Sequence, residues 1–146
     1  MAQFSTHQLE LLTSARIGHL ATADENARPH VIPVCFATDG RSIYSVLDLK
    51  PKRTALTRLR RVKNILANPQ ATLLVDHYEE DWENLWYLMV SGRAELVMDG
   101  QEQTDAVALL RDKYQQYHEM DIGLNPAIKI TPENIVSWGA TLGGSA

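Results

Sequence analysis

Residues 28–48 read RPHVIPVCFATDGRSIYSVLD, and this stretch decides the fold class. Its centre, Asp39-Gly40, is a strong hairpin turn, because these two residue types tolerate the backbone conformations that a two-residue turn requires. The apolar residues on either side predict strands over about 28–38 and 42–48. Pro29 and Pro33 cannot donate a hydrogen bond to a neighbouring strand, so part of the first strand is predicted to be unpaired or bulged, where a ligand could meet the backbone.

The rest of the chain adds four strands and three helices. Strands are predicted over 16–23, 71–78 and 85–97, with a bulge at Gly92, and a strand or strand pair over 127–138. Helices are predicted over about 5–14, through the basic segment to about 67, and over about 103–117. Only the connection through 51–69 places a long helix between strands that otherwise follow short turns, so a doubly wound parallel sheet is excluded. The prediction is a mostly β protein, an antiparallel β-barrel with peripheral helices.

Composition predicts one soluble domain over residues 1–146. Apolar residues make up 45% and charged residues 22% of the chain, which is ordinary for a globular protein. One cysteine excludes an internal disulfide and fits a reducing compartment. Neither a run of about 20 apolar residues nor a signal peptide is recognisable. We therefore expect a cytoplasmic protein with no membrane partner.

Charge is concentrated in one segment. Residues 50–63, KPKRTALTRLRRVK, hold seven of the 14 lysines and arginines, and no acid occurs between Asp48 and Asp76. Lys50, Lys52 and Arg53 fall where a strand ends and a helix begins, so free backbone N–H groups add to their charge and predict a phosphate site. The cations further along lie on the outward helix face and can be simply solvated: Arg58, Arg60, Arg61 and Lys63. A nucleic-acid partner is not expected for a protein with a pI near 5.7.

The motifs of most enzyme classes are absent from the sequence. The five histidines, at positions 7, 19, 30, 77 and 118, have no metal-site spacing, and Cys35 has no neighbouring base. No metal ligand and no catalytic residue is therefore predicted. The acids at 79–83 are interpreted as a solvated loop. The aromatic residues Trp82, Trp86, Tyr87 and Trp138 suit a core, a subunit interface or a flat ring ligand. Such a chain suits a cofactor that performs its own chemistry.

The segments RIGHLAT, RPHVIPVCF, SIYSVLDLKPKR, NILANPQATLLVDHY and LWYLMVSGRAEL, in this order, resemble the pyridoxamine-5′-phosphate-oxidase-like split-barrel proteins. Within that family the chain looks closest to the branch that uses the deazaflavin coenzyme F-420. The similarity runs from about Ala15 to Trp138. The resemblance implies a six-stranded antiparallel split β-barrel of the FMN-binding type, and a homodimer with two cofactor sites at its interface.

The resemblance also implies where a cofactor would lie. Lys50, Lys52 and Arg53 would hold its phosphate, with Ser45 and Val46 on the adjoining strand. Pro33 and Val34 would run along the ring system. Aromatic residues of the partner subunit, such as Trp86 and Trp138, would close the pocket. Arg61 and its neighbours would attract the polyglutamate tail of the deazaflavin.

One departure from the family affects the substrate. Pyridoxamine phosphate oxidases carry an arginine- and histidine-containing motif after a tryptophan near the C-terminus, whereas GATLGGSA follows Trp138 here. Pyridoxamine phosphate is therefore not the expected substrate. The resemblance favours an oxidoreductase that moves a hydride between F-420, or alternatively FMN, and a small conjugated substrate. The alternative is a non-catalytic haem or bilin carrier of the same fold, with His19, His30 or His77 as an axial ligand.

Overall fold

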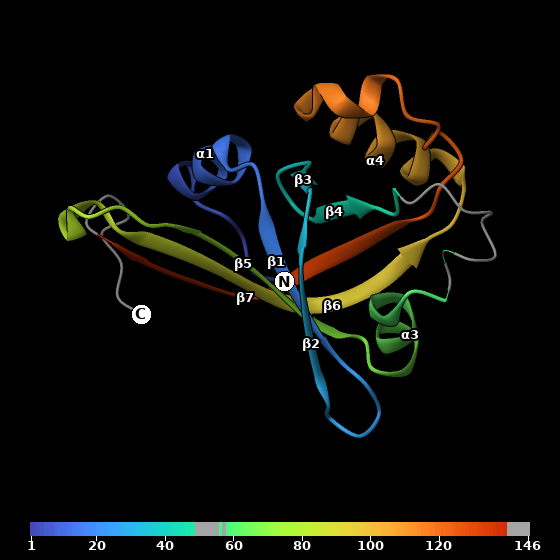
Figure 1. The fold of residues 1–146 in the computed structure, drawn as a ribbon, viewed down its shortest axis with the longest axis horizontal. Helices are drawn as coiled ribbons and strands as arrows, with labels where there is room; N and C mark the ends of the chain where they lie inside the picture. The colour runs from blue at the N-terminus through green and yellow to red at the C-terminus, as the bar shows by residue number, and fades with distance from the viewer. Residues whose placement is uncertain (49–55, 57, 140–146) are drawn as a thin grey trace.

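The computed structural model describes residues 1–48, 56 and 58–139 (Figure 1). The strands are β1 (Gly18–Ala23), β2 (Pro29–Val34), β3 (Ala37–Thr38), β4 (Ile43–Val46), β5 (Gln70–His77), β6 (Trp86–Val97) and β7 (Ala127–Gly139). The helices are α1 (Thr6–Ser14), α3 (Arg60–Ala67) and α4 (Gly100–Lys113), with short 3-10 helices η1 (Trp82–Asn84) and η2 (Gln115–His118). In the described residues no helix is long and apolar enough to cross a membrane.

The strands form one antiparallel sheet in the order β2-β1-β5-β6-β7-β4-β3. The predicted class, mostly β and antiparallel, is confirmed. The described residues contain seven strands rather than the predicted six, because the expected strand over 28–38 is interrupted at Cys35 and Phe36 and becomes β2 and β3. These two strands lie at opposite ends of the sheet order, yet only two residues join them. The sheet therefore curls until its two edges meet, as in an incomplete barrel (Figure 1).

The prolines of β2 lie on a sheet edge. β2 pairs with β1 along its whole length, including Pro33 opposite His19, and no strand of the described residues lies on its other side. The prediction that the prolines leave part of this strand unpaired or bulged is wrong for β2, which is paired with β1 throughout; inside the predicted strand, pairing is interrupted at Cys35 and Phe36. Because proline has no N–H to donate, both prolines fit an edge strand, and they leave the free edge poor in donors.

The predicted bulge lies where the sequence placed it. The register between β6 and β7 shifts between Ser91 and Gly92, and Gly92 faces Pro132 on β7. The predicted strand pair over 127–138 is one continuous strand, and Pro132 is accommodated at this irregularity. The predicted helix over 103–117 begins earlier, at Gly100, and ends at Lys113, after which the chain tightens into η2.

Two apolar clusters fill the inside of the curled sheet. The larger one joins α1 and α3 to the central strands, with Leu12, Val62, Leu73 and Val90 at 0–1% exposure. The smaller one packs α4 against β3, β4 and the start of β7, with Ala106 and Leu110 fully buried. Together they fix the end of β4 and the start of α3, the two elements that flank the basic segment.

The opposite side of the sheet is not covered by the described residues. Side chains alternate along a strand, and the row that includes Leu20, Leu73 and Val90 points inward. The other row is only half-buried or exposed across five strands. Its apolar members include Ala21, Val31, Pro33, Leu74, Tyr87, Met89, Val136 and Trp138, and its polar members include His19, Thr72, Asp76, Ser91 and Asn134. We call this row the outer sheet face.

Arg16 and Lys113 cap the C-terminal ends of two helices reciprocally. Lys113 donates from Nζ to the carbonyl of Leu12 in α1 at 2.8 Å, and Arg16, just after α1, donates to the carbonyl of Lys113 at 2.9 Å. Each cation also lies over an aromatic ring, Lys113 at 3.8 Å from the centre of Phe36. Burial and the charge of Arg16 lower the pKa of Lys113 to about 8.

This depressed pKa predicts how stability changes with pH. Between about pH 8 and 10.5, the ordinary lysine value, the unfolded chain binds more protons at residue 113 than the folded chain does. The free energy of unfolding of wild type should therefore rise with pH relative to Lys113→Met. Urea denaturation at several pH values measures the difference. Lys63→Met, at an exposed position, should give no such slope, and parallel curves for Lys113→Met would contradict the prediction.

Candidate functional site

The predicted phosphate ligands Lys50, Lys52 and Arg53 lie outside the described residues. The structure does describe both flanks of their segment. Leu47 at the end of β4 and Leu56 before α3 are each 0% exposed. A leucine on each side of residues 49–55 is therefore anchored in the core.

Arg61 is the described cation that differs most from the prediction. Arg58, Arg60 and Lys63 are exposed, as predicted, but Arg61 is half-buried, so its placement on the outward helix face was wrong. Burial lowers the pKa of Arg61, and the negative charge of Asp48 opposes this lowering. The Nε of Arg61 is buried and has no hydrogen-bond partner among the described residues. A buried, unpaired guanidinium donor is costly unless an acceptor completes it.

Asp48, which acts on Arg61 by its charge, is itself held by a hydrogen bond. Its Oδ2 accepts a hydrogen bond of 2.6 Å from the hydroxyl of Tyr117 in η2. Burial first, and this carboxylate second, raise the pKa of Tyr117. The Nδ2 of Asn125 donates to the carbonyl of Leu47 at 2.6 Å, so two contacts hold the end of β4 against the segment after α4.

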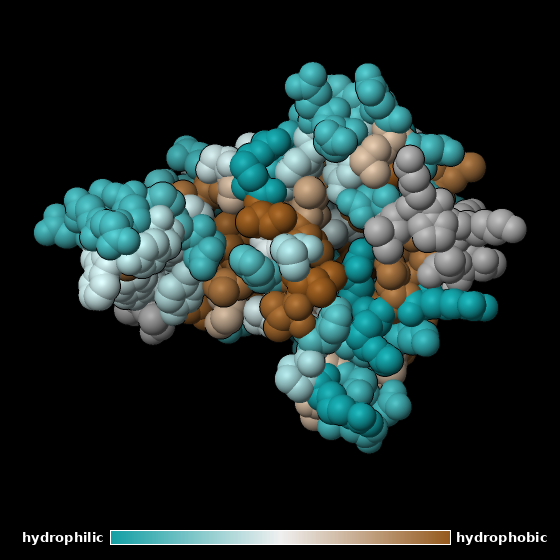
Figure 2. Space-filling view, in the orientation of Figure 1, coloured by the Kyte–Doolittle hydropathy of each residue, from teal (hydrophilic) through white to brown (hydrophobic). Residues whose placement is uncertain are grey.

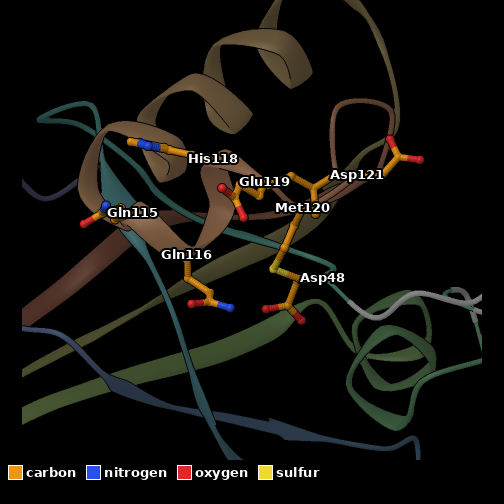
Figure 3. A pocket seen from close by; sticks show the side chains of 8 residues that line it. Asp48, Gln115, Gln116, His118, Glu119, Met120 and Asp121 are labelled. Carbon is orange, nitrogen blue, oxygen red and sulfur yellow. The ribbon is translucent and has the colours of Figure 1, made fainter.

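A cavity of about 940 Å³ opens beside Asp48. Its other lining residues come from 115–122, and in Figure 3 the side chain of Met120 extends toward Asp48, whose carboxylate points away from it. The lining is polar, and several of its side chains are carboxylates or amides. Asp48 follows β4 and is the last described residue before Lys50, Lys52 and Arg53 in the sequence.

A buried polar contact that the sequence did not reveal fixes α3. Asn64 is 1% exposed, and its Nδ2 donates to the hydroxyl of Thr22 on β1 at 3.1 Å. Asn64 lies one turn after Arg61, so this contact sets how the helix presents Arg61. The signal was available, since an asparagine on the apolar face of an amphipathic helix requires a partner.

The other predicted site residues lie on nearby strands. Ser45 and Val46 are buried in β4, and Val46 packs into the smaller apolar cluster. Pro33 is exposed on the outer sheet face, whereas the Val34 side chain is buried in the larger cluster. Of these four, Pro33 alone offers its side chain to a ligand, and the others could contribute only backbone atoms or, for Ser45, a buried hydroxyl.

Trp86 and Trp138 lie at the end of the β6–β7 pair that is opposite to the end where β7 pairs with β4. Trp86 stacks on His77 and Trp138 stacks on Tyr87, with ring centres 6.4 and 6.1 Å apart. Val46, at the end of β4, pairs with Ala127 at the start of β7, and Ala127 pairs with Val97 at the end of β6. Trp86 lies at the opposite end of β6, where the strand begins. The 12 residues of β6 span roughly 35 Å at about 3.3 Å per residue. Within one chain these tryptophans therefore lie far from the end of β4.

The histidines remain separate from one another. His19 is half-buried on the outer sheet face, and the Nδ1 of His30 is buried without a partner among the described residues. His77 contacts Glu79 at 2.5 Å, and this contact lowers the pKa of Glu79. Within the described ranges no three histidine, cysteine, aspartate or glutamate side chains are grouped to hold a metal ion.

Known proteins share both the sequence pattern and the fold. A family profile described as pyridoxamine 5′-phosphate oxidase matches residues 4–139, while no curated protein sequence matches the chain. A conserved hypothetical protein from Mycobacterium tuberculosis superposes with a TM-score of 0.73 at 17% identity, covering 100% of this chain and 91% of that one.

Two further solved structures differ in what they are named for. A protein described as an F420 reductase has a TM-score of 0.63 at 25% identity, covering 86% of this chain and 93% of that one. The heme storage protein HutZ from Vibrio cholerae has a TM-score of 0.69 at 15% identity, covering 94% and 95%. At the identities of the M. tuberculosis and V. cholerae proteins, the likeness shows a shared fold and no more.

Proposed function

The chain belongs to the pyridoxamine 5′-phosphate oxidase family, and on that premise we propose that it is an oxidoreductase that binds the deazaflavin F-420. The reaction would move a hydride between this cofactor and a small conjugated substrate. FMN is the alternative cofactor, because its ribityl phosphate offers the same anion to the same cations. The likeness to a protein described as an F420 reductase, at 25% identity, favours the deazaflavin.

The observation that carries the proposal is Arg61. Its half-buried guanidinium has an Nε–H without an acceptor among the described residues, next to a segment with three further cations in the sequence. An anionic group from a ligand would complete this donor and be held by charge-assisted hydrogen bonds. Arg61 is therefore proposed to hold the cofactor phosphate together with Lys50, Lys52 and Arg53, rather than a distal tail.

The residues of the chain would act by binding and positioning. A bound deazaflavin or flavin supplies the hydride acceptor or donor. The charge of Asp48 orients Arg61, and the 2.6 Å hydrogen bond from the Tyr117 hydroxyl holds Asp48 in place. The contact between Asn64 and Thr22 keeps α3 in place. Pro33, exposed on β2, offers an apolar surface beside the ring and excludes water from it.

The functional unit is proposed to be a homodimer. The outer sheet face exposes apolar side chains over five strands, and a face of this kind suits burial against a second copy. Trp86 and Trp138 lie too far along the sheet to reach the basic segment of their own chain, so a partner would have to provide aromatic cover.

A second candidate is a haem carrier without turnover. His19 is half-buried on the outer sheet face, where a flat ring between two copies would find an imidazole. The fold is shared with a protein named for heme storage. The likeness to the heme storage protein is at 15% identity and that to the F420 reductase at 25%, which places this reading second.

An absorbance titration tests the proposal. Purified protein is expected to bind F-420 with a dissociation constant in the micromolar range or below, and FMN more weakly. A Soret band after addition of haemin, with no response to either flavin, would replace the proposal with the carrier. Binding of none of the three would reject both functions.

A further inference from the structure

We propose that Lys113 is a site of covalent modification, at which its side-chain amine takes an acyl group from an acyl phosphate. Lys113 is the last residue of α4, is half-buried, and lines a surface cavity of about 340 Å³. None of the residues that line this cavity takes part in the proposed cofactor site, so this second site goes beyond the proposed function.

Three elements surround the cavity. Its lining residues come from α1 and the turn after it, from β3 and from the end of α4: Thr13, Arg16, Ala37, Thr38, Asp112 and Lys113. β3 lies between α1 and α4 (Figure 1). Over this region, polar and apolar side chains adjoin on the surface seen in Figure 2. Such a surface suits a reagent that has an anionic head and an uncharged acyl group.

The amine of Lys113 is held without a carboxylate. Its Nζ donates to the carbonyl of Leu12 at 2.8 Å and lies 3.8 Å from the centre of the Phe36 ring. Asp112 lines the same cavity, but within the described residues no ion pair joins it to Lys113. A half-buried ammonium without an opposite charge loses hydration that a carbonyl and a ring replace only in part. This position therefore favours the uncharged amine, which is the nucleophilic form.

The neighbouring titratable groups act in the same direction on balance. Burial, and then the positive charge of Arg16, lower the pKa of Lys113 to about 8, while Cys35, between β2 and β3, opposes them. Tyr114, whose ring centre lies 5.4 Å from Nζ, stays neutral because burial raises its pKa. At about pH 7.5 roughly a quarter of such a lysine is neutral, against roughly one in a thousand at the ordinary lysine pKa.

Arg16 is the reason for choosing an acyl phosphate as the donor. Its exposed guanidinium lines the cavity and donates to the backbone carbonyl of Lys113 at 2.9 Å, so it lies beside the amine. A phosphate group on the donor would be attracted to this cation and held by charge-assisted hydrogen bonds. The same cation thus favours the neutral amine and recruits an anionic reagent to it.

The step is a nucleophilic acyl substitution. The lone pair of Nζ attacks the carbonyl carbon of the donor, a C–N bond forms, and the bond from that carbon to the phosphate oxygen breaks. Inorganic phosphate leaves with the electron pair, and the proton lost by the amine passes to phosphate or to solvent. The product is an amide, which removes one positive charge from the junction of α1 and α4.

Acetyl phosphate tests the reactivity of the wild-type protein. After incubation at about pH 7.5, peptide mass spectrometry should show acetylation of Lys113 about 10-fold faster than that of Lys63, which is exposed on α3. The rate at Lys113 should level off above about pH 8. In urea-unfolded protein the ratio of the two rates should fall to about one, because the neighbours of Lys113 are lost. Equal rates in the folded protein, or a rate at Lys113 that rises without a plateau, would overturn the modification site.

Arg16→Gln tests the choice of donor. This variant should acetylate Lys113 about fivefold more slowly with acetyl phosphate, but less than about twofold more slowly with the neutral donor p-nitrophenyl acetate. Arg41→Gln, in the exposed turn between β3 and β4, is the matched control and should change neither rate. An equal fall with both donors would overturn the assignment to acyl phosphates. If Arg16→Gln does not fold, the rates of the two donors at Lys113 of wild type in about 0.5 M salt decide, since salt should slow only acetyl phosphate.

Discussion

Lys52→Ala is expected to weaken F-420 binding by about 10- to 100-fold. In the proposed site, the ammonium of Lys52 makes charge-assisted hydrogen bonds to the cofactor phosphate, each worth roughly 1.5–3 kcal/mol. Since about 1.4 kcal/mol is a factor of ten in affinity, losing one such contact gives this range. Titration of the cofactor absorbance against wild type and variant measures it, with thermal unfolding as the check that the variant is folded.

The control for Lys52→Ala removes the same charge elsewhere. Arg41→Ala lies in the exposed turn between β3 and β4 and changes net charge equally, so it should leave the affinity within about twofold. Equal affinity of Lys52→Ala and wild type would show that Lys52 does not bind the cofactor phosphate. Among the described residues, Arg61 would then be the cation that the structure supports for this role.

Gly92→Ala is expected to cost about 3 kcal/mol or more of folding free energy. A Cβ at this position would lie 2.0 Å from the carbonyl oxygen of Thr131 and 3.1 Å from the backbone nitrogen of Glu133. Both atoms belong to the backbone of β7, so no side-chain rotation relieves the overlap, and the two strands would have to separate. Urea denaturation measures the loss, which corresponds to a fall in melting temperature on the order of 10 °C.

The same substitution at another glycine is the control. At Gly123 the nearest atom to an added Cβ is the Nη2 of Arg111 at 4.0 Å, so Gly123→Ala should change stability by less than about 1 kcal/mol. Equal stability of Gly92→Ala and wild type would show that the bulge between Ser91 and Gly92 can shift its register.

The local signals that predicted the fold are strong ones. Asp39-Gly40 favours a turn, and the prolines of β2 favour an edge strand, because of the backbone chemistry of these residues themselves. Gly92 favours a bulge because it has no side chain. Distant residues do not alter these local preferences. The split of the strand over 28–38 could not be predicted, because Val34, Cys35 and Phe36 continue the apolar run without a turn residue. That break depends on closing the sheet around the core, which is a property of the whole fold.

The candidate site was harder to predict for a related reason. Helical periodicity placed Arg61 with its charged neighbours, but α3 begins only at Arg60 and is rotated by the contact between Asn64 and Thr22. The partners of Arg61 come from the end of β4 and from η2, distant in sequence. Charge density along the chain located the region, and only the packing distinguished the buried cation from the exposed ones.

The strand order also determines when each strand can find its partner during synthesis of the chain. Besides β3, the neighbour of β4 is β7, and Ile43 pairs with Ile130, which follows it by 87 residues. β1, β2, β5 and β6 can assemble as soon as they leave the ribosome, whereas β4 must wait for the C-terminal strand and close a long loop. At about 5–20 residues per second, synthesis takes roughly 4 to 17 s to supply that strand. During this interval the nascent half-sheet has open edges, and we expect it to depend on chaperones.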